Sequence, residues 1–469
     1  MLTKRIVFLL LLALVALDVA AQQMRTLHKV QSKETVYGIA RSYGLTLEEI
    51  IAANPEMSEP KYKLRKGDII NIPYPASKVK EDSAAVSAQD ASAASKRRDD
   101  MTKRAIRVGV MLPLHDSTAD GKRMVEYYRG VLMACDSLKQ EGVSVDVFAW
   151  NVPEDGDITA ALGDENAALC DLIIGPLYSK HMAALSAFVA ENDIKLLVPF
   201  SINAPQLAVN SHIYQVYRNP DDYNHAVVAH FVDRFKDCRT VLIDCGDAKS
   251  TKGAFTAALR SQLEALGREL KITSLKTPED QFVKAFSKDV PNVVVLNTSR
   301  ASDLNIALAK LKNVVLVGDV PADDAAYGDA EPAESQYKLS LFGYTEWLTY
   351  TGKTLADFYL FDTYVPSVFY YNAAAARTAR IETKYRWNFH ADMIQQQPRF
   401  AITGFDQAYF FIKGLKSYGS VFTGAKGTVD YSPVQTPLHF EQIDGGGYKN
   451  GALMFIHYTP DKRVETIRY

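Results

Sequence analysis

Two serines in this chain follow short apolar runs that have the length and composition of buried strands. Ser179 follows the run at 172–174, and Phe200 and Ser201 follow the run at 194–198. The carboxyl ends of parallel strands meet at one edge of a sheet, where helix N-termini and free backbone N–H groups also gather. The sequence therefore predicts a candidate ligand site at this edge.

The segment between the two serines has the pattern of a helix. Met182, Leu185 and Val189 recur at helical spacing, and Ser179 is a residue type that often caps a helix N-terminus. Residues 171–201 are therefore predicted to form a strand–helix–strand unit. A plain helix cap is an alternative role for Ser179, and it explains the position as well as ligand binding does.

Ten aromatic residues lie between 344 and 371. Aromatic side chains can stack on sugars or hold an apolar ligand. A run of this kind near a domain crossing is more typical of a packed hinge, which is the interpretation we favour. If the run were exposed, it would instead mark a protein interface.

Sequence patterns of catalysis are weak in this chain. The Gly-Lys-Thr triplet at 352–354 lacks the earlier glycine of a phosphate-binding loop, and the Ser-x-x-Lys spacing at 335–338 has no partner motifs. The Asp-Gly-Gly-Gly run at 444–447 fits a hairpin turn between strands at 438–443 and 452–458. Nine histidines form no HExxH pattern. The sequence predicts a protein that is not an enzyme and that needs no cofactor or metal.

The composition is that of a globular protein with a sizeable core, since 47% of the residues are hydrophobic and 23% are charged. The 53 Lys and Arg residues are balanced by 55 Asp and Glu residues, which argues against nucleic acid as a partner. Cys238 and Cys245 flank one predicted strand, so they should lie too far apart to form a disulfide. For Cys135 and Cys170, a disulfide and two free thiols both remain open.

Residues 1–21 have the features of a secretory signal peptide. Lys4 and Arg5 precede an apolar run at 6–17, and small residues at 19–21 suit cleavage before Gln22. The apolar run is short for a membrane span, and no cysteine follows the cleavage position to carry a lipid. We therefore expect an exported protein of the periplasm or cell envelope without a membrane span.

Residues 24–75 are predicted to form a small separate module. An alternating strand pattern at 27–30 is followed by Glu34 and Thr35, which open a first helix. A second helical pattern then precedes a closing strand at 69–73. The predicted order is strand, helix, helix, strand.

The module resembles the LysM family in the segments HKV, ETVYGIARSYGLTLEEIIAANP and LRKGDIINIP. The resemblance implies a βααβ fold that binds glycans containing N-acetylglucosamine, chiefly peptidoglycan. Lys33 stands where the family usually has glycine, so a LysM fold that does not bind glycan is the alternative. The glycan-binding residues implied by the resemblance are Glu34, Thr35, Val36, Tyr37, Asn54 and Pro55.

Residues 76–104 are predicted to be a flexible linker. Ala, Ser, Asp and Lys dominate the segment, and it contains no aromatic residue. Such a composition cannot bury enough apolar surface to fold alone.

From residue 105 onward, strand patterns alternate with helical patterns, which is typical of α/β domains. The first series contains a strand at 106–112, a helix at 124–138, a strand at 143–150 and the unit at 171–201. The second series contains strands at 240–244, 270–275, 293–297 and 314–317, with helices at 222–235, 255–266 and 302–311. Two successive series predict two lobes of similar build.

Four segments, IRVGVMLPL, YYRGVLMACDSL, IIGPLYS with IKLLVPFS, and FAITGFDQAYFFIKGLKSYG, resemble the type I periplasmic solute-binding proteins of the leucine/isoleucine/valine-binding class. The resemblance covers residues 105–469 and implies a bilobed α/β fold with interleaved lobes. Lobe one would span 105–217 and 372–418, and lobe two would span 218–371 and 419–469. Three crossings would form the hinge, and a ligand would lie between the lobes.

The same resemblance suggests roles for individual residues. Ser179 would receive the α-carboxylate of an amino acid, and Glu346 would be a lobe-two acid that faces an ammonium group. A solvated loop carboxylate is the alternative for Glu346. The family usually has two small residues and a threonine where this chain has Phe200, Ser201 and Ile202. This altered loop departs from the amino-acid-binding pattern.

The LysM resemblance and the predicted signal peptide together imply an envelope protein bound to peptidoglycan, and two functions remain open for its bilobed domain. In the favoured one, the bilobed domain is a scaffold or regulator that docks an envelope protein, a use that resembles the lipoprotein activators of penicillin-binding proteins. In the alternative, it is a receptor for an amino acid, peptide or cell-wall fragment, for example for an ABC transporter. The altered loop and the glycan tether favour docking.

Overall fold

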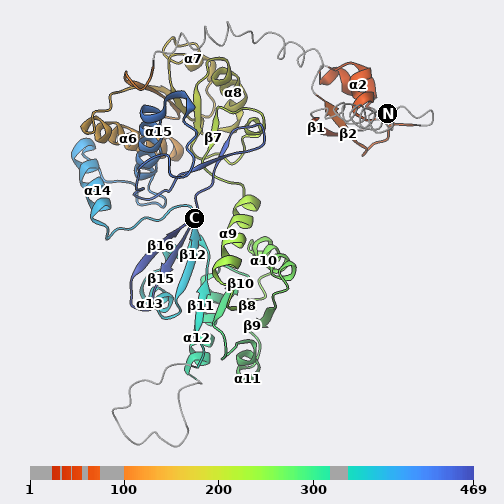
Figure 1. Cartoon of the computed structure of the whole chain (residues 1–469), viewed down its shortest axis with the longest axis vertical. Helices are drawn as coiled ribbons and strands as arrows, with labels where there is room; N and C mark the ends of the chain where they lie inside the picture. Colours follow the sequence, from red (N-terminus) through yellow and green to blue (C-terminus); the bar gives the residue numbers. More distant parts are fainter. Residues whose placement is uncertain are drawn as a thin grey trace, which may run out of the picture. The chain divides into compact units, whose positions relative to one another are not determined.

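The computed structural model describes residues 24–31, 34–43, 45–54, 57, 62–73, 100–316 and 336–469. The chain divides into two compact units, Met1–Asp99 and Asp100–Tyr469 (Figure 1). The predicted signal peptide and nearly all of the predicted linker lie outside the described residues. Among the described residues, no helix combines the length and the apolar character needed to cross a bilayer.

The first unit has the predicted βααβ order. β1 (Met24–Lys29) pairs with β2 (Ile69–Pro73) in antiparallel fashion, and α2 (Val36–Ser42) and α3 (Leu47–Ala53) connect the two strands. Thr46 and Glu49 form a capping box at the start of α3, which satisfies two backbone N–H groups. The small apolar core consists of Val30, Ile39, Ala40, Leu45, Ile50, Ile70 and Ile72.

The second unit contains two α/β lobes, and in its described residues each lobe has a seven-stranded sheet. The sheet of lobe one has the order β13-β14-β7-β6-β5-β3-β4, and that of lobe two has the order β16-β15-β12-β11-β10-β8-β9. In lobe one, the strands from β4 to β14 in this spatial order pair in parallel, and β13 is antiparallel at the edge. In lobe two, the strands from β9 to β12 in this spatial order pair in parallel, and β15 and β16 are antiparallel at the edge. The predicted bilobed α/β architecture is confirmed.

Lobe one is built mainly from the first part of the unit. Its strands are β3 (Ile106–Leu112), β4 (Val145–Asn151), β5 (Leu172–Ile174), β6 (Lys195–Val198), β7 (Ile213–Gln215), β13 (Phe440–Gln442) and β14 (Tyr448–Asn450). Its helices are α6 (Ala119–Gln140), α7 (Thr159–Leu162), α8 (Met182–Glu191), α14 (Ala376–Phe389) and α15 (Phe400–Tyr418). β5, α8 and β6 form the predicted strand–helix–strand unit, because β5 and β6 pair in parallel.

Lobe two contains most of the second series. Its strands are β8 (Arg239–Asp244), β9 (Leu270–Ser274), β10 (Asn292–Leu296), β11 (Leu339–Phe342), β12 (Thr363–Ser367), β15 (Met454–Tyr458) and β16 (Val464–Arg468). Its helices are α9 (Pro220–Arg234), α10 (Gly253–Ala265), α11 (Glu279–Phe282), α12 (Ala301–Leu316) and α13 (Gly352–Leu360). The strand predicted at 314–317 is wrong for its described residues, because α12 continues through Leu316. Val314 is buried in the same core cluster as Leu304, Leu308 and Leu311 of this helix.

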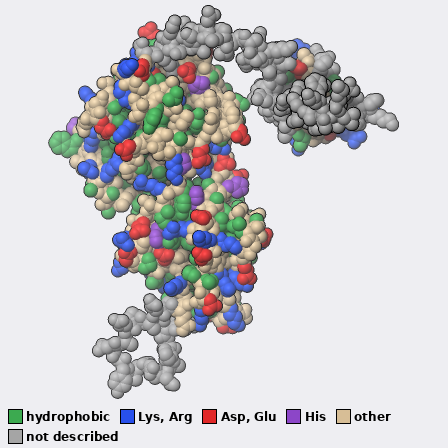
Figure 2. Space-filling view, viewed as in Figure 1, with side chains coloured by type: hydrophobic (Ala, Val, Ile, Leu, Met, Phe, Trp, Pro, Cys, Tyr) green, Lys and Arg blue, Asp and Glu red, His purple; other side chains and the backbone are tan. Residues whose placement is uncertain are grey.

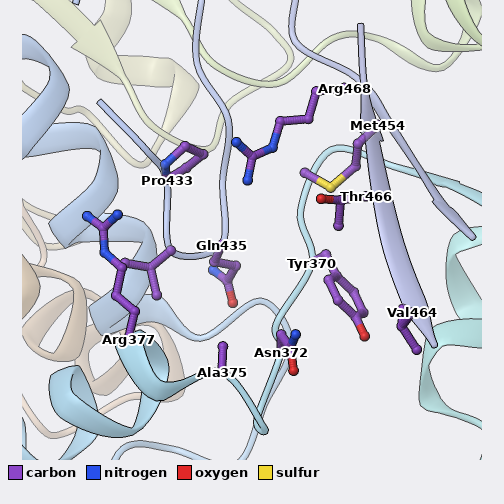
Figure 3. A pocket seen from close by; sticks show the side chains of 11 residues that line it. Tyr370, Asn372, Ala375, Arg377, Pro433, Gln435, Met454, Val464, Thr466 and Arg468 are labelled. Carbon is purple, nitrogen blue, oxygen red and sulfur yellow. The ribbon is translucent and has the colours of Figure 1, made fainter. Parts of the chain in front are cut away.

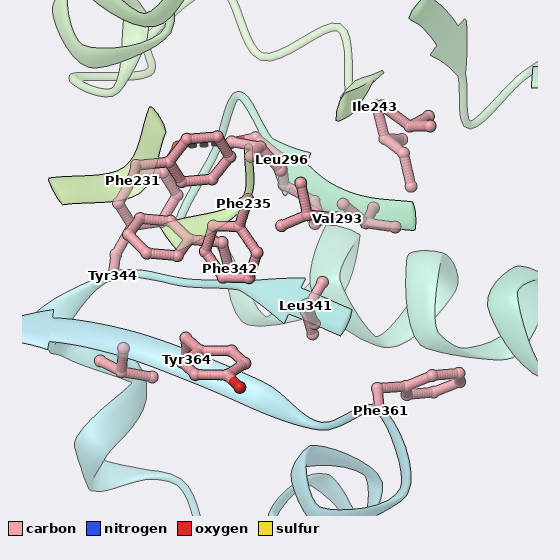
Figure 4. Close-up of a cluster of buried hydrophobic side chains, with 14 of the residues drawn as sticks. Phe231, Phe235, Ile243, Val293, Leu296, Leu341, Phe342, Tyr344, Phe361 and Tyr364 are labelled. Atoms are coloured by element: carbon pink, nitrogen blue, oxygen red, sulfur yellow. Dashed lines mark hydrogen bonds between the residues drawn. The ribbon is translucent and has the colours of Figure 1, made fainter. Parts of the chain in front are cut away.

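The aromatic run at 344–371 forms part of the core of lobe two. Trp347, Phe358 and Phe361 are fully or almost fully buried, and they pack in the same cluster as Phe231 and Phe342. Figure 4 shows this cluster around strands β10, β11 and β12. Most of the run therefore lies in the interior of lobe two. Its last three residues, 369–371, lie between β12 of lobe two and α14 of lobe one, where the sequence predicted a hinge core.

The chain crosses between the lobes at 216–219, 368–375 and 451–453, as the membership of the flanking strands shows. The first two crossings lie near the predicted positions. The third does not, because residues 419–450 were predicted in lobe two and belong to lobe one. β14 pairs with β7, and Phe422 and Phe440 lie in the core of lobe one.

The reason for this difference lies in the turn at 444–447. It closes a hairpin between β13 and β14, which extends the sheet of lobe one. The next strand, β15, pairs with β12 instead and so belongs to lobe two. The hairpin turn was predicted at the correct place, but its second strand was predicted at 452–458.

Two buried carboxylates hold lobe one together. Asp406 in α15 is fully buried, and its oxygens accept hydrogen bonds from the hydroxyl of Tyr431 and from three backbone N–H groups at 434–436. Asp171 accepts two hydrogen bonds from the Arg104 guanidinium, at 2.7 and 2.8 Å. Both carboxylates thus anchor a neighbouring segment that has no regular secondary structure.

Candidate functional site

Four of the predicted glycan-binding residues of the first unit, at 34–37, lie at the start of α2. The Glu34 carboxylate accepts hydrogen bonds from the backbone N–H of Gln31, at 2.6 Å, and from the His28 ring, at 2.8 Å. These bonds hold the pKa of Glu34 below its usual value. Thr35 caps α2 by accepting a hydrogen bond from the Gly38 N–H at 3.1 Å. Val36 is half-buried, and the side chain of Tyr37 lies outside the described residues.

Asn54 has a structural role in this module. Its side chain is fully buried, and its amide nitrogen donates to the backbone carbonyls of Ile50 and Asn71, both at 2.8 Å. Its amide oxygen accepts from the N–H of Asn71 at 2.7 Å. Asn54 thus joins the end of α3 to β2, and its polar atoms have partners inside the module. Pro55 lies outside the described residues.

The predicted site of lobe one begins with Ser179, which lies after β5 as expected. It is exposed and starts a short 3₁₀ helix, Ser179–His181, that precedes α8. Neither that turn nor α8 has a side-chain cap hydrogen bond. The helix-cap alternative is therefore not seen, and the hydroxyl stands at the sheet edge where a ligand could approach.

Phe200 fills the same edge of lobe one with an aromatic cluster. Its ring centroid lies 5.3 Å from that of Tyr127, 5.5 Å from that of Phe400 and 6.1 Å from that of Tyr217. Burial raises the pKa of Tyr217 to about 12. Rings from α6, α15 and the first crossing thus pack together at the position where a solute site would need open polar groups.

Ser201 makes local contacts only with its own loop. Its hydroxyl accepts from the N–H of Asn203 at 3.1 Å and lies 3.3 Å from the carbonyl of the same residue. This is a small side-chain turn of the kind that serine commonly makes. Its hydroxyl is thus engaged within the loop.

Glu346 lies on the other lobe, in a separate pocket of about 310 Å³. Its carboxylate pairs with the ammonium of Lys252 at 2.5 Å, and that ammonium also lies 4.8 Å from the centre of the Tyr344 ring. The pocket is lined by residues of lobe two, among them Pro220, Tyr223, Lys252, Tyr344, Glu346 and Pro366. An ammonium of the chain itself thus occupies the place predicted for a ligand ammonium.

Sequence reasoning missed Lys252. The residue follows β8 at the carboxyl edge of the lobe-two sheet, in the loop KSTK. A cation at the end of a parallel strand is a usable signal for a site at this edge. Nothing in the sequence, however, paired this loop with Glu346, which lies 94 residues further along the chain.

A second pocket, of about 190 Å³, lies beside the second crossing (Figure 3). Tyr370, Asn372 and Arg377 line it from the second crossing and α14, and Thr466 and Arg468 line it from β16. The backbone N–H of Tyr370 also donates to the carbonyl of Gln435 at 2.9 Å. This pocket is therefore part of the hinge, and the sequence did not predict it.

The structure does not gather the predicted ligand residues into one pocket. Phe200 and Ser201 lie on lobe one, as does Ser179, and none of them lines the pocket that contains Glu346. Among the described residues, each predicted polar group other than Ser179 already has a partner within the protein.

Residues 28–73 match the family model of the LysM domain. This part of the chain is a LysM domain. The match spans the end of β1, both helices and β2 of the first unit, so the resemblance predicted from the sequence is confirmed. A search of curated proteins finds no match to the chain.

Solved structures similar in fold to the second unit include binding proteins at low sequence identity. A putative branched-chain amino acid ABC transporter protein from Rhodospirillum rubrum is 15% identical, with 78% of this chain and 100% of that chain covered and a TM-score of 0.49. The leucine-binding protein LivK from Thermotoga maritima is 11% identical, with 77% and 98% covered and a TM-score of 0.36.

The C-domain of LpoA from Haemophilus influenzae, described as a regulator of PBP1A, is 13% identical, with 77% of this chain and 99% of that chain covered and a TM-score of 0.45. At these identities the similarity concerns the fold alone. The function of the second unit is therefore argued from its own residues.

Proposed function

We propose that this protein is a non-enzymatic component of the cell envelope, held on peptidoglycan by its LysM domain, and that its bilobed domain docks an envelope protein. Export by the predicted signal peptide would bring it to the periplasm. The tether would keep the bilobed domain close to the wall, which suits a scaffold or regulator better than a freely diffusing receptor.

The observation that carries this proposal is the aromatic cluster around Phe200. A solute site of moderate size usually combines an apolar lining with a few open polar groups that fix the ligand. Here the sheet edge of lobe one carries packed rings, and Ser201 is engaged within its own loop. On lobe two, Lys252 neutralises Glu346. These contacts favour a domain that recognises a partner through its surface.

Native mass spectrometry of fragment 100–469 is the first test of this proposal. The fragment is compared before and after it is unfolded and refolded. We expect the same apo mass in both samples, and no thermal shift from amino acids, peptides or muropeptides. A small-molecule adduct found only in the first sample would make the domain a solute receptor and contradict docking.

The solute-receptor alternative is favoured by one observation, the pocket around Glu346. If that pocket and the lobe-one edge held a solute, the double substitution Ser179→Ala and Ser201→Ala would abolish function. Under the docking proposal, the same double variant keeps its function. The two proposals therefore predict opposite results for one variant.

The tether is tested by sedimentation with purified peptidoglycan sacculi. We expect the mature chain to sediment with sacculi and fragment 100–469 to stay in the supernatant. Equal sedimentation of the two proteins would show that the LysM domain does not hold this protein on the wall.

A further inference from the structure

Helix α14 is fixed to lobe one through its inner face. Ile381 and Tyr385 lie in the lobe-one core, and the Tyr385 hydroxyl accepts a hydrogen bond from Arg129 of α6 at 3.0 Å. Lys384 pairs with Asp136, also of α6, at 2.6 Å. The helix is therefore a rigid part of the lobe, and its opposite face has a defined shape.

The opposite face, which we call the α14 outer face, consists of Ala379, Arg380, Thr383, Trp387 and Asn388. These residues, with Lys384, line an open hollow of about 510 Å³. The Trp387 side chain is 79% exposed, the highest value among the large apolar residues of the described part. The indole makes no ring contact or hydrogen bond with any described residue. Tryptophan in such a position is typical of the centre of a protein interface.

The charge of α14 is strongly positive, although the whole chain is almost neutral. The helix carries Arg377, Arg380, Lys384 and Arg386 against a single acid, Glu382. Lys384 pairs with Asp136 and Arg386 pairs with Asp392, so the charge that remains for a partner is concentrated on Arg380. Arg380 is exposed and has no ion pair or hydrogen bond with any described residue. Figure 2 shows hydrophobic atoms projecting beside Lys and Arg atoms at the edge of lobe one, where α14 lies in Figure 1. A ligand of this face would therefore need both carboxylates and an apolar group.

Building on the proposed docking function, we propose that the α14 outer face is the docking surface, and that the partner presents an acidic segment with an apolar side chain. The apolar side chain packs on Trp387, and a carboxylate pairs with Arg380. Charge complementarity decides the chemistry of the partner. An anionic membrane is a poorer fit, since Ala379, Thr383 and Asn388 do not supply the wide apolar face that membrane-surface helices bury.

The first step of the test is photocrosslinking in the envelope. A photoreactive amino acid replaces Thr383 in the full chain, and another replaces Val421, an exposed apolar residue of lobe one that lies outside α14. We expect a discrete protein adduct at 383 and not at 421. Mass spectrometry of the crosslinked peptide should then show carboxylates beside an apolar residue. A basic or uncharged peptide would overturn the proposal.

The second step measures the affinity of the identified partner for purified variants. Trp387→Ala and Arg380→Glu should each weaken binding by about tenfold or more, as expected for residues at the centre of an interface. The matched controls Val421→Ala and Lys426→Glu should bind within about twofold of wild type. A carboxylate-to-lysine change in the crosslinked peptide should restore binding to Arg380→Glu. Wild-type affinity of both α14 variants would overturn the inference.

The outcomes separate this inference from the docking function itself. If fragment 100–469 binds an envelope protein and both α14 variants bind it equally well, docking stands and the α14 surface is wrong. If no protein binds the fragment, the docking function fails. If the protein binds phosphatidylglycerol vesicles and Arg380→Glu abolishes that binding, the partner of this face is a membrane. If the protein forms a dimer that Trp387→Ala dissociates, the partner is a second copy of this chain.

Discussion

At the scale of single residues, Asp406 shows how one carboxylate organises a long irregular segment. Three backbone N–H groups and one hydroxyl point at it from residues 431–436, and the desolvation caused by burial raises its pKa in spite of these bonds. Gln435 of the same segment accepts a hydrogen bond from the second crossing. The carboxylate therefore positions one side of the hinge.

Replacement of Asp406 by alanine should destabilise fragment 100–469 by about 3 kcal/mol or more, because buried backbone donors lose their acceptor. Urea unfolding followed by circular dichroism measures the change. Asp430→Ala, at an exposed position of the same region, is the control and should change stability by less than about 0.5 kcal/mol. An unchanged midpoint for Asp406→Ala would contradict this role.

Asp362 should make the stability of the fold depend on pH, with a defined sign. Burial alone would raise its pKa, but the contacts of its carboxylate with His457, at 2.6 Å, and Ser340, at 2.8 Å, outweigh that effect and hold the pKa below its usual value. A lowered pKa stabilises the fold above the unfolded-state value of about 3.9, and this contribution is lost as the pH falls through the folded-state pKa. At pH 6 the melting temperature of the wild type should be higher than that of Asp362→Asn. The difference between the two melting temperatures should be smaller at about pH 3. An equal difference at both pH values would rule the mechanism out.

The candidate site shows the limit of sequence reasoning at this scale. Ser179 and Ser201 were correctly placed after their strands, because apolar runs and turns are local signals. The packing of Phe200 against Phe400 joins positions 200 residues apart, and no local pattern reveals such a contact. The pairing of Lys252 with Glu346 is of the same kind.

At the scale of elements, the close contact between α6 and α15 depends on two glycines. A Cβ atom on Gly130 would lie 1.9 Å from the carbonyl oxygen of Ala401, and one on Gly404 would lie 2.1 Å from that of Tyr127. Both contacts are with backbone atoms, which cannot rotate away. The two helices can approach this closely only because these positions lack side chains.

Gly404→Ala should therefore destabilise fragment 100–469 by about 1–3 kcal/mol, as overpacking usually does. Gly253→Ala is the matched control, since a Cβ atom there meets no atom within 4 Å and alanine favours the helix. Chemical denaturation of both variants checks this. A Gly404→Ala protein as stable as wild type would show that the helices can separate without cost.

Element types were predicted well and element partners less well. Strands and helices of lobe one and lobe two follow hydrophobic periods that can be read locally, as the unit at β5, α8 and β6 shows. The end of α12 was predicted as a strand at 314–317, because a β-branched apolar run fits either a strand or a buried helix face. The partner of a strand depends on distant residues, which is why β15 was predicted as the hairpin partner of β13 and the short strand β14 was not predicted.

At the scale of the whole molecule, the chain combines two units with separate cores. Units of this kind usually unfold independently. In calorimetry, the melting temperature of the bilobed domain in the mature chain should lie within about 2 °C of its value in fragment 100–469. A shift of that size corresponds to a change of less than about 1 kcal/mol in the free energy of unfolding. A clearly lower melting temperature in the fragment would mean that the LysM domain stabilises the bilobed domain.

The interleaved lobes also determine when each sheet can close during synthesis. Lobe two receives β15 and β16 only after the last strand of lobe one has been made, so β12 has an open edge until residues 454–468 leave the ribosome. An unpaired strand edge is a template for aggregation. A nascent chain that ends near residue 450 would therefore carry a complete sheet in lobe one and an unpaired strand edge in lobe two. Chaperones would be expected to bind lobe two of such a chain.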